Sequence, residues 1–205
     1  MPLSSGAEIP SDLPTSSTTN REMERQRLRA LDRSGLLDSG DEERFDRLTR
    51  QAQSRFGVST AIISLIAEDR QYLKSFAGPF PRAVERHAAF CNVTIQSDRT
   101  LVVPDLLADA RFRDNPLVKG APYTRFYAGV PLRGPGGWFV GSMCILDPQP
   151  RDLDRQGLAQ LRRLADEAEL EVNGAGSALP AAPGTYAFGA KSSSAMPSGS
   201  RNSGM

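Results

Sequence analysis

Hydrophobic residues recur at helical spacing near both ends of the chain. Residues 21–35 are rich in Arg and Glu, and Gly35 is expected to end this first helix. Residues 153–172 predict a long amphipathic last helix. The narrow apolar seam of the first helix suits packing against a partner helix. The apolar positions are Met23, Leu28 and Leu31 in the first pattern, and Leu158, Leu161, Ala165, Ala168 and Val172 in the last.

A second helical pattern follows the first, over residues 36–57. Ser39 or Asp41 is expected to be its N-cap, because a short side-chain oxygen can accept a hydrogen bond from a free backbone N–H group. Gly57 is expected to end the helix. Its apolar face consists of Phe45, Leu48, Ala52 and Phe56.

Between these helices the spacing changes to that of strands. Residues 58–67, VSTAIISLIA, are β-branched and mostly apolar, which predicts a strand buried on both faces. Residues 68–70 make a turn into the alternating stretch QYLKSFAG, which completes an antiparallel hairpin. RFYAGVPL and GGWFVGSMCILD predict a second hairpin, joined by the turn-rich RGPGG. In the first hairpin, Tyr72, Lys74 and Phe76 are expected on one face and Leu73, Ser75 and Ala77 on the other.

The segment between the hairpins is less regular. Residues 79–96 predict a loop and a short helical segment around residues 89–95, and residues 101–105, LVVPD, predict a short strand. The order of helices, hairpins and crossover indicates an α+β fold, in which an antiparallel twisted β-sheet has helices packed on one side.

Composition limits this fold to one part of the chain. The 205 residues are enough for one domain with a real core. Residues 1–20 are rich in Ser, Thr and Pro, and residues 174–205 are rich in Gly, Ser, Ala and Pro. Both segments are expected to be disordered tails because they bury too little apolar surface to offset their ordering entropy. The folded domain is therefore expected over residues 21–173.

Charge and hydropathy bear on partners and location. Lys and Arg number 25 against 24 Asp and Glu, and the net charge of +1 creates no global field that would attract nucleic acid or anionic lipid. The N-terminus does not resemble a secretory signal, and no stretch approaches the roughly 20 apolar residues that span a bilayer. We therefore expect no nucleic-acid or membrane partner, and a cytoplasmic location with both cysteines reduced.

Several catalytic constellations are missing from the sequence. His87 is the only histidine, which argues against Ser-His-Asp, Cys-His and multi-histidine metal sites. The grouped acids of EERFD stand at a helix start, where they favour the helix dipole. No phosphate-cradling glycine pattern precedes a Lys-Ser or Lys-Thr pair. These patterns indicate a protein that is not an enzyme.

Five stretches together resemble a GAF domain, the sensory module of many bacterial signalling proteins. They are AIISLIAEDRQYLKSFAG, AFCNVTI, VVPDLLADARFRDNPLV, RFYAGVPL and GSMCILDPQPRDL, in that order. The resemblance implies a small-molecule pocket on the side of the sheet opposite the helices, roofed by the irregular crossover. The side chains that it implies for this pocket are Phe76, Phe90, Cys91, Asp105, Phe112, Arg125 and Tyr127.

The resemblance also implies how such a protein acts. It predicts a sensory module that binds a small-molecule ligand or a signalling protein and works by association, as a homodimer through the first and last helices. The ligand and any cofactor are unknown. Bilin attachment is disfavoured because Cys91 is followed by Asn92 and not by His, and the cyclic-nucleotide signature is missing.

Two alternatives remain open at this point. One branch of the family reduces free methionine-R-sulfoxide with several cysteines, and Cys91 lies near the position of one of them. Cys144 falls in a predicted strand, and the other family cysteines have no counterpart here. The second alternative is a ligand-free interaction scaffold, in which Phe112 and Tyr127 fill a core and Asp105 caps a turn.

Overall fold

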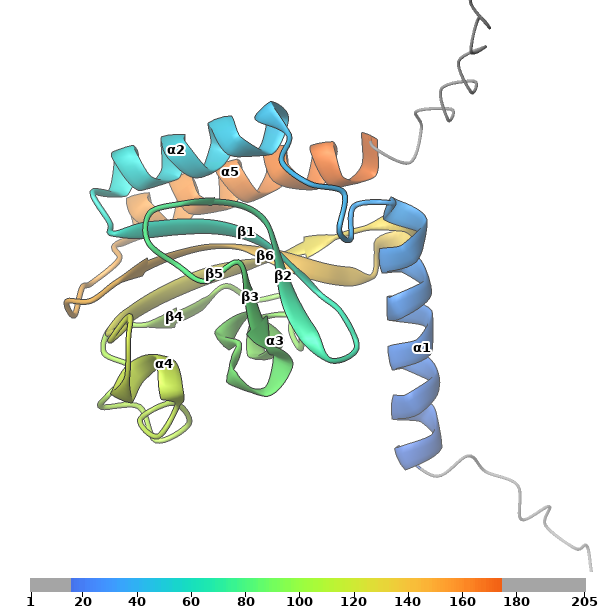
Figure 1. Cartoon of the computed structure of the whole chain (residues 1–205), viewed down its shortest axis with the longest axis horizontal. Helices are drawn as coiled ribbons and strands as arrows, with labels where there is room; N and C mark the ends of the chain where they lie inside the picture. The colour runs from blue at the N-terminus through green and yellow to red at the C-terminus, as the bar shows by residue number, and fades with distance from the viewer. Residues whose placement is uncertain (1–15, 175–205) are drawn as a thin grey trace, which may run out of the picture.

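The two predicted hairpins form the centre of a six-stranded sheet (Figure 1). The computed structural model describes residues 16–174, and every strand pairing within this range is antiparallel. The strand order is β3-β2-β1-β6-β5-β4, so the two hairpins meet where β1 pairs with β6. The strands are β1 Thr60–Ile66, β2 Arg70–Ala77, β3 Ala83–Glu85, β4 Leu101–Val103, β5 Phe126–Arg133 and β6 Phe139–Asp147.

Helices surround this sheet unequally. In Figure 1 the two helices α2 and α5 lie together over one face of the sheet, whereas the short α3 and α4 lie on the opposite side and α1 stands at one end. The predicted α+β class, with an antiparallel sheet and helices packed on one side, is therefore confirmed. The helices are α1 Ser16–Ser34, α2 Glu43–Phe56, α3 Phe90–Thr94, α4 Pro116–Lys119 and α5 Arg155–Gly174, with one-turn 3₁₀ helices at Arg86–Ala88 and Pro135–Gly137.

The first helix begins earlier in the chain than composition predicts. The helix α1 begins at Ser16, inside the segment that composition assigns to the N-terminal tail, and ends before Gly35 in a left-handed conformation. Most of the remainder of both predicted tails lies outside the described residues. None of the helices within residues 16–174 combines the length and the apolar character needed to cross a membrane.

The face of the sheet under α2 and α5 carries the helix-side core. Its members come from both central hairpins and from the apolar stripes of the helices, as the helical spacing predicts. Leu158 of the predicted stripe is only half-buried, whereas Leu164, which the prediction omitted, is buried. The buried residues of the helix-side core include Phe45, Leu48, Ala52, Ile63, Leu65, Phe126, Ala128, Val130, Leu161, Ala165 and Ala168.

A bulge in β2 changes the predicted alternation. Ile63 pairs with Ser75 and Ser64 pairs with Leu73, so Lys74 is the extra residue of a bulge. Because of this extra residue, the neighbours Lys74 and Ser75 both point toward the α2 side of the sheet, where Ser75 contacts Thr49. The alternation of faces predicted for β2 is interrupted there. The predicted grouping of Tyr72, Lys74 and Phe76 on one face is therefore wrong.

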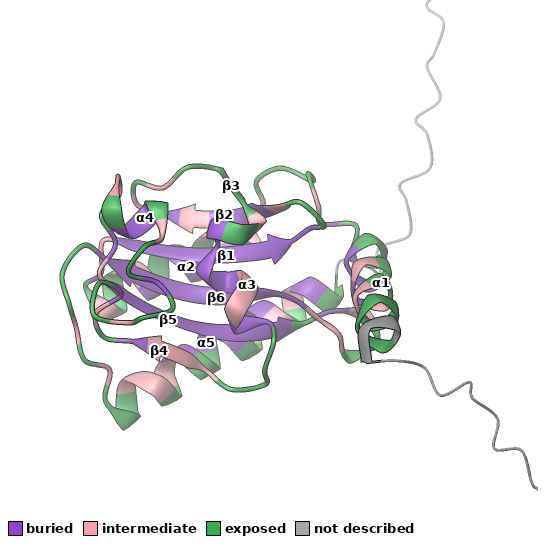
Figure 2. Cartoon of the chain, turned by 90° about the horizontal axis from the view of Figure 1, so that it is seen from below, coloured by how far each residue is buried: buried purple, intermediate pink, exposed green. Residues whose placement is uncertain are grey.

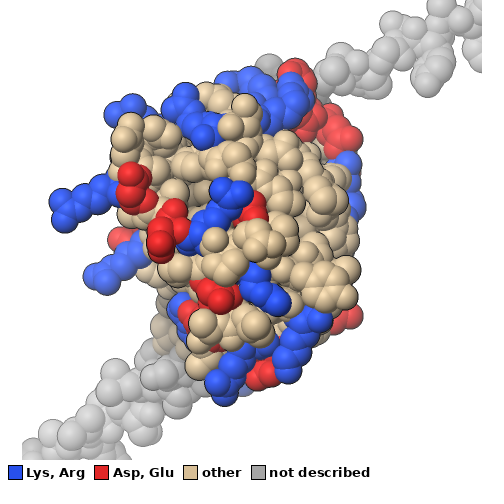
Figure 3. All heavy atoms as spheres, turned by 90° about the vertical axis from the view of Figure 1, so that its left-hand side faces the viewer, with Lys and Arg blue, Asp and Glu red and all other residues tan. Residues whose placement is uncertain are grey.

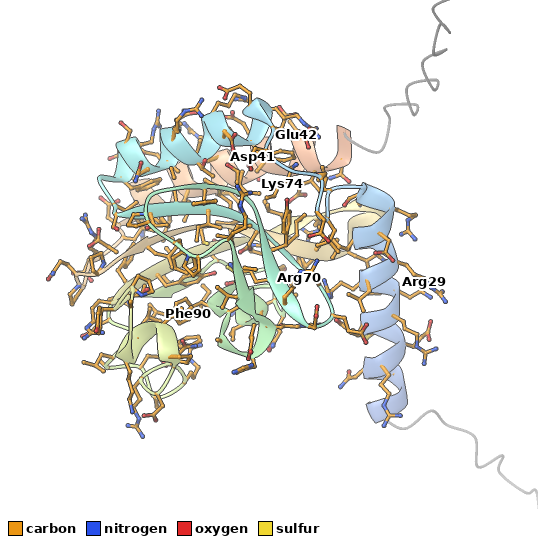
Figure 4. All side chains as sticks on the ribbon, in the orientation of Figure 1. Arg29, Asp41, Glu42, Arg70, Lys74 and Phe90 are labelled. Atoms are coloured by element: carbon orange, nitrogen blue, oxygen red, sulfur yellow. The ribbon has the colours of Figure 1, made fainter. Side chains whose placement is uncertain are left out.

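The same lysine explains why α2 has an unexpected beginning. Lys74 is fully buried, and its ammonium donates to Ser39 Oγ at 2.6 Å, to the Gly40 carbonyl at 2.7 Å and to Glu42 (Figure 4). Asp41 accepts from Arg82 at 2.7 Å. Because Ser39 and Asp41 are engaged in this way, neither is the N-cap; Glu42 holds that position without a side-chain cap bond. The predicted end at Gly57 is confirmed, with φ of 56°.

Candidate functional site

A second core lies on the other face of the sheet, beneath α3, α4 and the crossover (Figure 2). We call it the crossover-side core. It includes four of the side chains that the sequence suggested for a pocket, and none of these four is more than 4% exposed. Its buried members are Ile62, Ile66, Leu73, Val84, Ala88, Phe90, Cys91, Ile95, Val103, Leu106, Phe112, Leu117, Val118, Tyr127, Cys144 and Leu146.

Three aromatic rings pack together in this core. The rings of Phe90 and Phe112 meet edge to face with centroids 5.6 Å apart, and Phe90 lies 5.4 Å from Tyr127 in a tilted arrangement. Both geometries suit the charge distribution of aromatic rings. The crossover therefore carries two of the rings, and the floor strand β5 carries the third.

Polar atoms are enclosed among these rings. The Sγ atoms of Cys91 on α3 and Cys144 on β6 lie 3.6 Å apart, and the Tyr127 hydroxyl donates to Cys91 Sγ at 3.5 Å. Thr94 Oγ1 lies 2.6 Å from the same hydroxyl. On the floor, Ser64 Oγ lies 3.2 Å from Ser142 Oγ. We call this group the thiol–hydroxyl cluster: Ser64, Cys91, Thr94, Tyr127, Ser142 and Cys144.

Gly129 makes room for the tyrosine of this cluster. A Cβ atom at Gly129 would lie 2.2 Å from the hydroxyl oxygen of Tyr127, which is far inside contact distance. Residues 127 and 129 lie on the same face of β5, and Gly129 pairs with Cys144 on β6. The absent side chain thus lets the Tyr127 ring lie along its own strand and place its hydroxyl beside Cys91. This accounts for the glycine within the aromatic strand.

The environment of the two thiols separates their acidities. Burial opposes ionisation of Cys91, but hydrogen bonds from Cys144, Ser142, Ser64 and Tyr127 outweigh it and lower the Cys91 pKa to about 6. Burial raises the pKa of Cys144 well above its ordinary value, and the neighbouring Cys91 adds to this rise. Burial and the two sulfurs likewise raise the pKa of Tyr127, so its hydroxyl remains a donor. The arrangement favours one thiolate beside one thiol.

The other three predicted site residues lie at the margins of this core. Phe76 is half-buried against it, with the Arg82 guanidinium 5.0 Å from its ring centre. Asp105 accepts from the Leu107 backbone N–H at 3.0 Å, so it caps a turn. Arg125 donates to the Val118 carbonyl at 3.0 Å and thereby ties β5 to α4. The structure brings together Phe90, Cys91, Phe112 and Tyr127, with Phe76 nearby.

Sequence reasoning missed three hydroxyl residues of the cluster. Ser64 and Ser142 stand in strands that read as apolar, and their proximity follows from the antiparallel pairing that sets these two residues opposite each other. Thr94 lies on α3, and no local sequence pattern indicates that it faces the Tyr127 hydroxyl. The one signal available was that residues 62, 64 and 66, and 142, 144 and 146, share a face by strand alternation.

Arg86 connects the crossover with α1. Its Nε donates to Asn92 Oδ1 at 2.8 Å, and its Nη1 donates to Glu24 Oε1 on α1 at 2.6 Å. Glu24 also accepts a hydrogen bond from Arg27 Nη2, and Arg27 Nη1 donates to the Ile66 carbonyl at 2.7 Å. Partial burial opposes the charge on Glu24, but hydrogen bonds from Arg27 and Arg86 outweigh it and lower the carboxyl pKa to about 2. We call this chain of contacts from α3 to α1 the Arg86 bridge.

Other chemistry is sparse in the described part of the chain. His87 is exposed and lies 3.2 Å from Glu85. Within residues 16–174, no group of three or more His, Cys, Asp and Glu side chains is arranged to hold a metal ion. Positive and negative side chains are interspersed on the face shown in Figure 3.

Hollows at the surface lie away from the thiol–hydroxyl cluster. One of about 660 Å³ is lined by Arg55, Arg151 and Asp154 among others, where α2 ends and α5 begins. Another of about 720 Å³ lies between α1 and the Arg86 region. Neither is lined by the residues that the sequence suggested for a ligand.

Comparison with known families explains this architecture. The family described as "GAF domain" matches residues 42–172, which is more than half of the chain. The chain belongs to the GAF domain family. The predicted resemblance is therefore confirmed, and the matched region contains the six strands of the described sheet, the helix α2, and α5 as far as residue 172.

Among curated proteins, a cyclic di-GMP phosphodiesterase of Pseudomonas aeruginosa is 37% identical over 145 residues. The match covers 70% of this chain but 25% of the relative, so this GAF protein spans about a quarter of that relative's length. The phosphodiesterase activity is a property of the relative.

Solved structures show the same fold at low sequence identity. The PixJ GAF domain of Thermosynechococcus elongatus is 16% identical, with a TM-score of 0.52 over 72% of this chain and 87% of that one. A free methionine-R-sulfoxide reductase from Neisseria meningitidis, solved with its substrate, is 18% identical, with a TM-score of 0.52 over 80% of this chain and 94% of that one. These likenesses establish the fold.

Proposed function

We propose that this GAF domain is a non-catalytic sensory module in bacterial signal transduction, which receives a signal on the crossover side of its sheet and reports it through α1. The Arg86 bridge is the observation that carries this proposal. Asn92 follows Cys91 on α3, so a shift of α3 changes the position of the group that Arg86 holds. Arg86 in turn holds Glu24 on α1. Input and output are thus two charge-assisted hydrogen-bonding steps apart.

The output of the proposed sensor is association through its first and last helices. Residues 19–23 of α1 are all exposed, and Met23 among them is 50% exposed. Leu170 on α5 is 75% exposed. Both helices end at the β5–β6 turn, where Arg33 donates to the Pro135 carbonyl at 3.4 Å and Asn173 donates to the Arg133 carbonyl at 2.9 Å. A second copy that packs along the length of α1 and against the end of α5 would meet exposed apolar groups on both helices.

The proposed input is a small molecule or a partner protein that acts on the crossover. A ligand that binds among Phe76, Phe90, Cys91, Asp105, Phe112, Arg125 and Tyr127 has to displace side chains that now pack together. Such a ligand would select a more open arrangement of α3. The two uncombined thiols suit a reducing compartment, which supports a cytoplasmic location for the sensor.

The packed crossover-side core favours a second candidate, a ligand-free interaction scaffold. Phe112 and Tyr127 fill this core, and Asp105 caps a turn, as this alternative predicts. The methionine sulfoxide reductase alternative has less support, because it needs an accessible thiolate and a site for substrate, and Cys91 and Cys144 are both buried.

Native mass spectrometry of the protein purified from its own host tests the proposal. We expect dimers, and a retained small molecule would appear as added mass on the subunit. Met23→Glu should give monomers because it places a charge in the proposed interface, while its melting temperature should match the wild type because Met23 is exposed. Arg29→Gln, which lowers the net charge by the same one unit at an exposed position of the same helix, is the matched control for charge alone (Figure 4).

The outcomes separate the two candidates. Dimers that carry no added mass, and whose proportion does not change when an extract of host small molecules is added, would support the ligand-free scaffold. Monomeric wild-type protein at high micromolar concentration would overturn association through these helices.

A further inference from the structure

Cys91 and Cys144 are both uncombined thiols buried in the crossover-side core, and their sulfur atoms face each other across it. We propose that Cys91 and Cys144 form an oxidisable pair that closes to a reversible disulfide on reaction with hydrogen peroxide or another small hydroperoxide. This oxidation would be the signal received on the crossover side. The inference rests on the proposed function only for its output through α1.

The geometry of the pair requires a small movement. The Sγ atoms lie 3.6 Å apart and must approach by about 1.5 Å to reach a bond length of roughly 2.05 Å. Cys144 is fixed in the central strand β6, paired on both sides. Cys91 lies on α3, a helix of 5 residues whose N-cap makes no side-chain hydrogen bond. A helix this short has little cooperative stability of its own, so α3 is the element that moves.

The surroundings supply the chemistry of each step. Tyr127 donates to Cys91 Sγ, and Thr94 lies in contact with the Tyr127 hydroxyl, so two hydroxyl groups in series can stabilise a thiolate at Cys91. The lowered pKa of Cys91 and the raised pKa of Cys144 assign the attacking and the resolving sulfur. Differences in acidity of this kind are typical of oxidisable cysteines beside a resolving thiol.

The reaction balances with peroxide as the oxidant. The Cys91 thiolate attacks one peroxide oxygen, the O–O bond breaks, and hydroxide leaves, which gives a sulfenic acid at Cys91. The Cys144 sulfur then attacks the Cys91 sulfur and breaks the S–O bond, and the hydroxyl group leaves as water with the proton of Cys144. Two sulfurs lose two electrons in total, and the peroxide gains them. An external dithiol reverses the reaction.

Access to the pair is the step that sets the rate. Cys91 is 2% exposed, so a hydroperoxide reaches it when α3 opens. Small neutral oxidants need a smaller opening than charged thiols such as glutathione. We therefore expect a disulfide in preference to a mixed disulfide with glutathione.

Movement of α3 by disulfide closure reaches α1 through the Arg86 bridge. Asn92 is the next residue after Cys91 and holds Arg86 Nε at 2.8 Å. A displacement of about 1.5 Å at Cys91 is enough to break a hydrogen bond of this length if Asn92 follows it. Oxidation should therefore loosen the contact between Arg86 and Glu24 and free the N-terminal half of α1.

To test the proposal, the full-length protein is treated with hydrogen peroxide, and the peroxide is then removed with catalase. The protein is unfolded in denaturant and its free thiols are alkylated with iodoacetamide. We expect both alkylation adducts to disappear together, with a mass loss of two hydrogen atoms, and to return after dithiothreitol. Peptide mapping should find Cys91 joined to Cys144 within one chain. Unchanged alkylation of both thiols, under conditions that oxidise free glutathione completely, would overturn the proposal.

Two single variants assign the roles. In Cys144→Ala, Cys91 should form a sulfenic acid that dimedone traps, whereas in Cys91→Ala the Cys144 thiol should remain alkylatable after peroxide. Dimedone labelling of Cys144 in the Cys91→Ala variant would contradict the assignment. The wild-type measurement decides the main point even if either variant fails to fold.

Hydrogen exchange separates this proposal from the proposed function. If the disulfide forms and exchange in α1 rises while exchange in α5 stays unchanged, both stand; Arg86→Met should then raise α1 exchange without peroxide. If the disulfide forms and α1 does not respond, the oxidisable pair stands and output through α1 is rejected. If no disulfide forms, this inference fails, whereas the proposed sensory function is still tested by the native mass spectrometry of dimers and retained ligand.

Discussion

The two cores of this GAF domain face each other across one sheet, yet they differ in composition and in cover. The helix-side core lies under two long helices and is a large apolar cluster, beside which the buried polar side chains Lys74, Ser75 and Thr49 have hydrogen-bonding partners. The crossover-side core lies under helices of 5 and 4 residues and encloses two thiols and several hydroxyl groups. One side provides stability because it buries apolar surface under rigid elements. The other side holds its thiols under helices too short to have much cooperative stability of their own.

The largest expected effect comes from the helix-side core. Phe45→Ala should lower the free energy of unfolding by about 4 kcal/mol, because it leaves a cavity beneath α2. It also removes the ring that lies 4.6 Å from the Arg44 guanidinium carbon. Urea unfolding measures this loss.

Phe56→Ala is the matched control for that change. Phe56 lies on the same helix face, but it is only half-buried, so its loss should be less than half as large. Equal losses for the two variants would mean that burial under α2 does not set the stability of this side.

A smaller effect is expected when the crossover-side core is overfilled. Gly129→Ala places a Cβ 2.2 Å from the Tyr127 hydroxyl oxygen and should cost about 1 to 3 kcal/mol. Since Tyr127 must move away from Cys91, the Cys91 pKa should also rise toward its ordinary value. Thiol alkylation rate against pH measures this shift.

The double variant Gly129→Ala with Tyr127→Phe tests whether the hydroxyl is the cause. It removes the nearest clashing atom but keeps the ring carbon Cζ, which lies 2.7 Å from the added Cβ, so it should recover part of the lost stability without restoring the low Cys91 pKa. A double variant no more stable than Gly129→Ala alone would show that the clash is not with this hydroxyl.

The smallest expected effect concerns pH and the link between the crossover and α1. The Glu24 carboxyl has a folded pKa of about 2, below the ordinary 4.5. Its contribution is therefore fully present above about pH 4.5 and is lost as the pH falls toward 2. Glu24→Gln should remove this part of the pH dependence of unfolding. Asp32→Asn, which removes an exposed negative charge from the same helix, is the control.

The regular part of the fold follows from the sequence, because its signals are local. Gly35 and Gly57 end helices where left-handed backbone is needed, and the two hairpins follow from strand spacing and turn residues. The start of α2 could not be predicted, because Ser39 and Asp41 have distant partners in Lys74 and Arg82. Lys74 reaches Ser39 from a bulge that no alternation pattern shows.

The candidate site was predicted in part for a similar reason. The resemblance to the family singled out Cys91 and Tyr127, and the structure brings both together with Cys144. The distance between the two sulfurs depends on how α3 sits over β6, across 53 residues of sequence. Ser64 and Ser142 lie side by side only because of the register between β1 and β6.

The shortness of the two outermost strands has a consequence for how copies of the domain can meet. The strands β3 and β4 contain 3 residues each, and exposed Arg82 and Glu85 flank or end the first of them. Such edges offer too few unpaired backbone groups to template another strand, and the charges oppose it. The short, charged edges therefore disfavour growth of the sheet from molecule to molecule into open-ended aggregates.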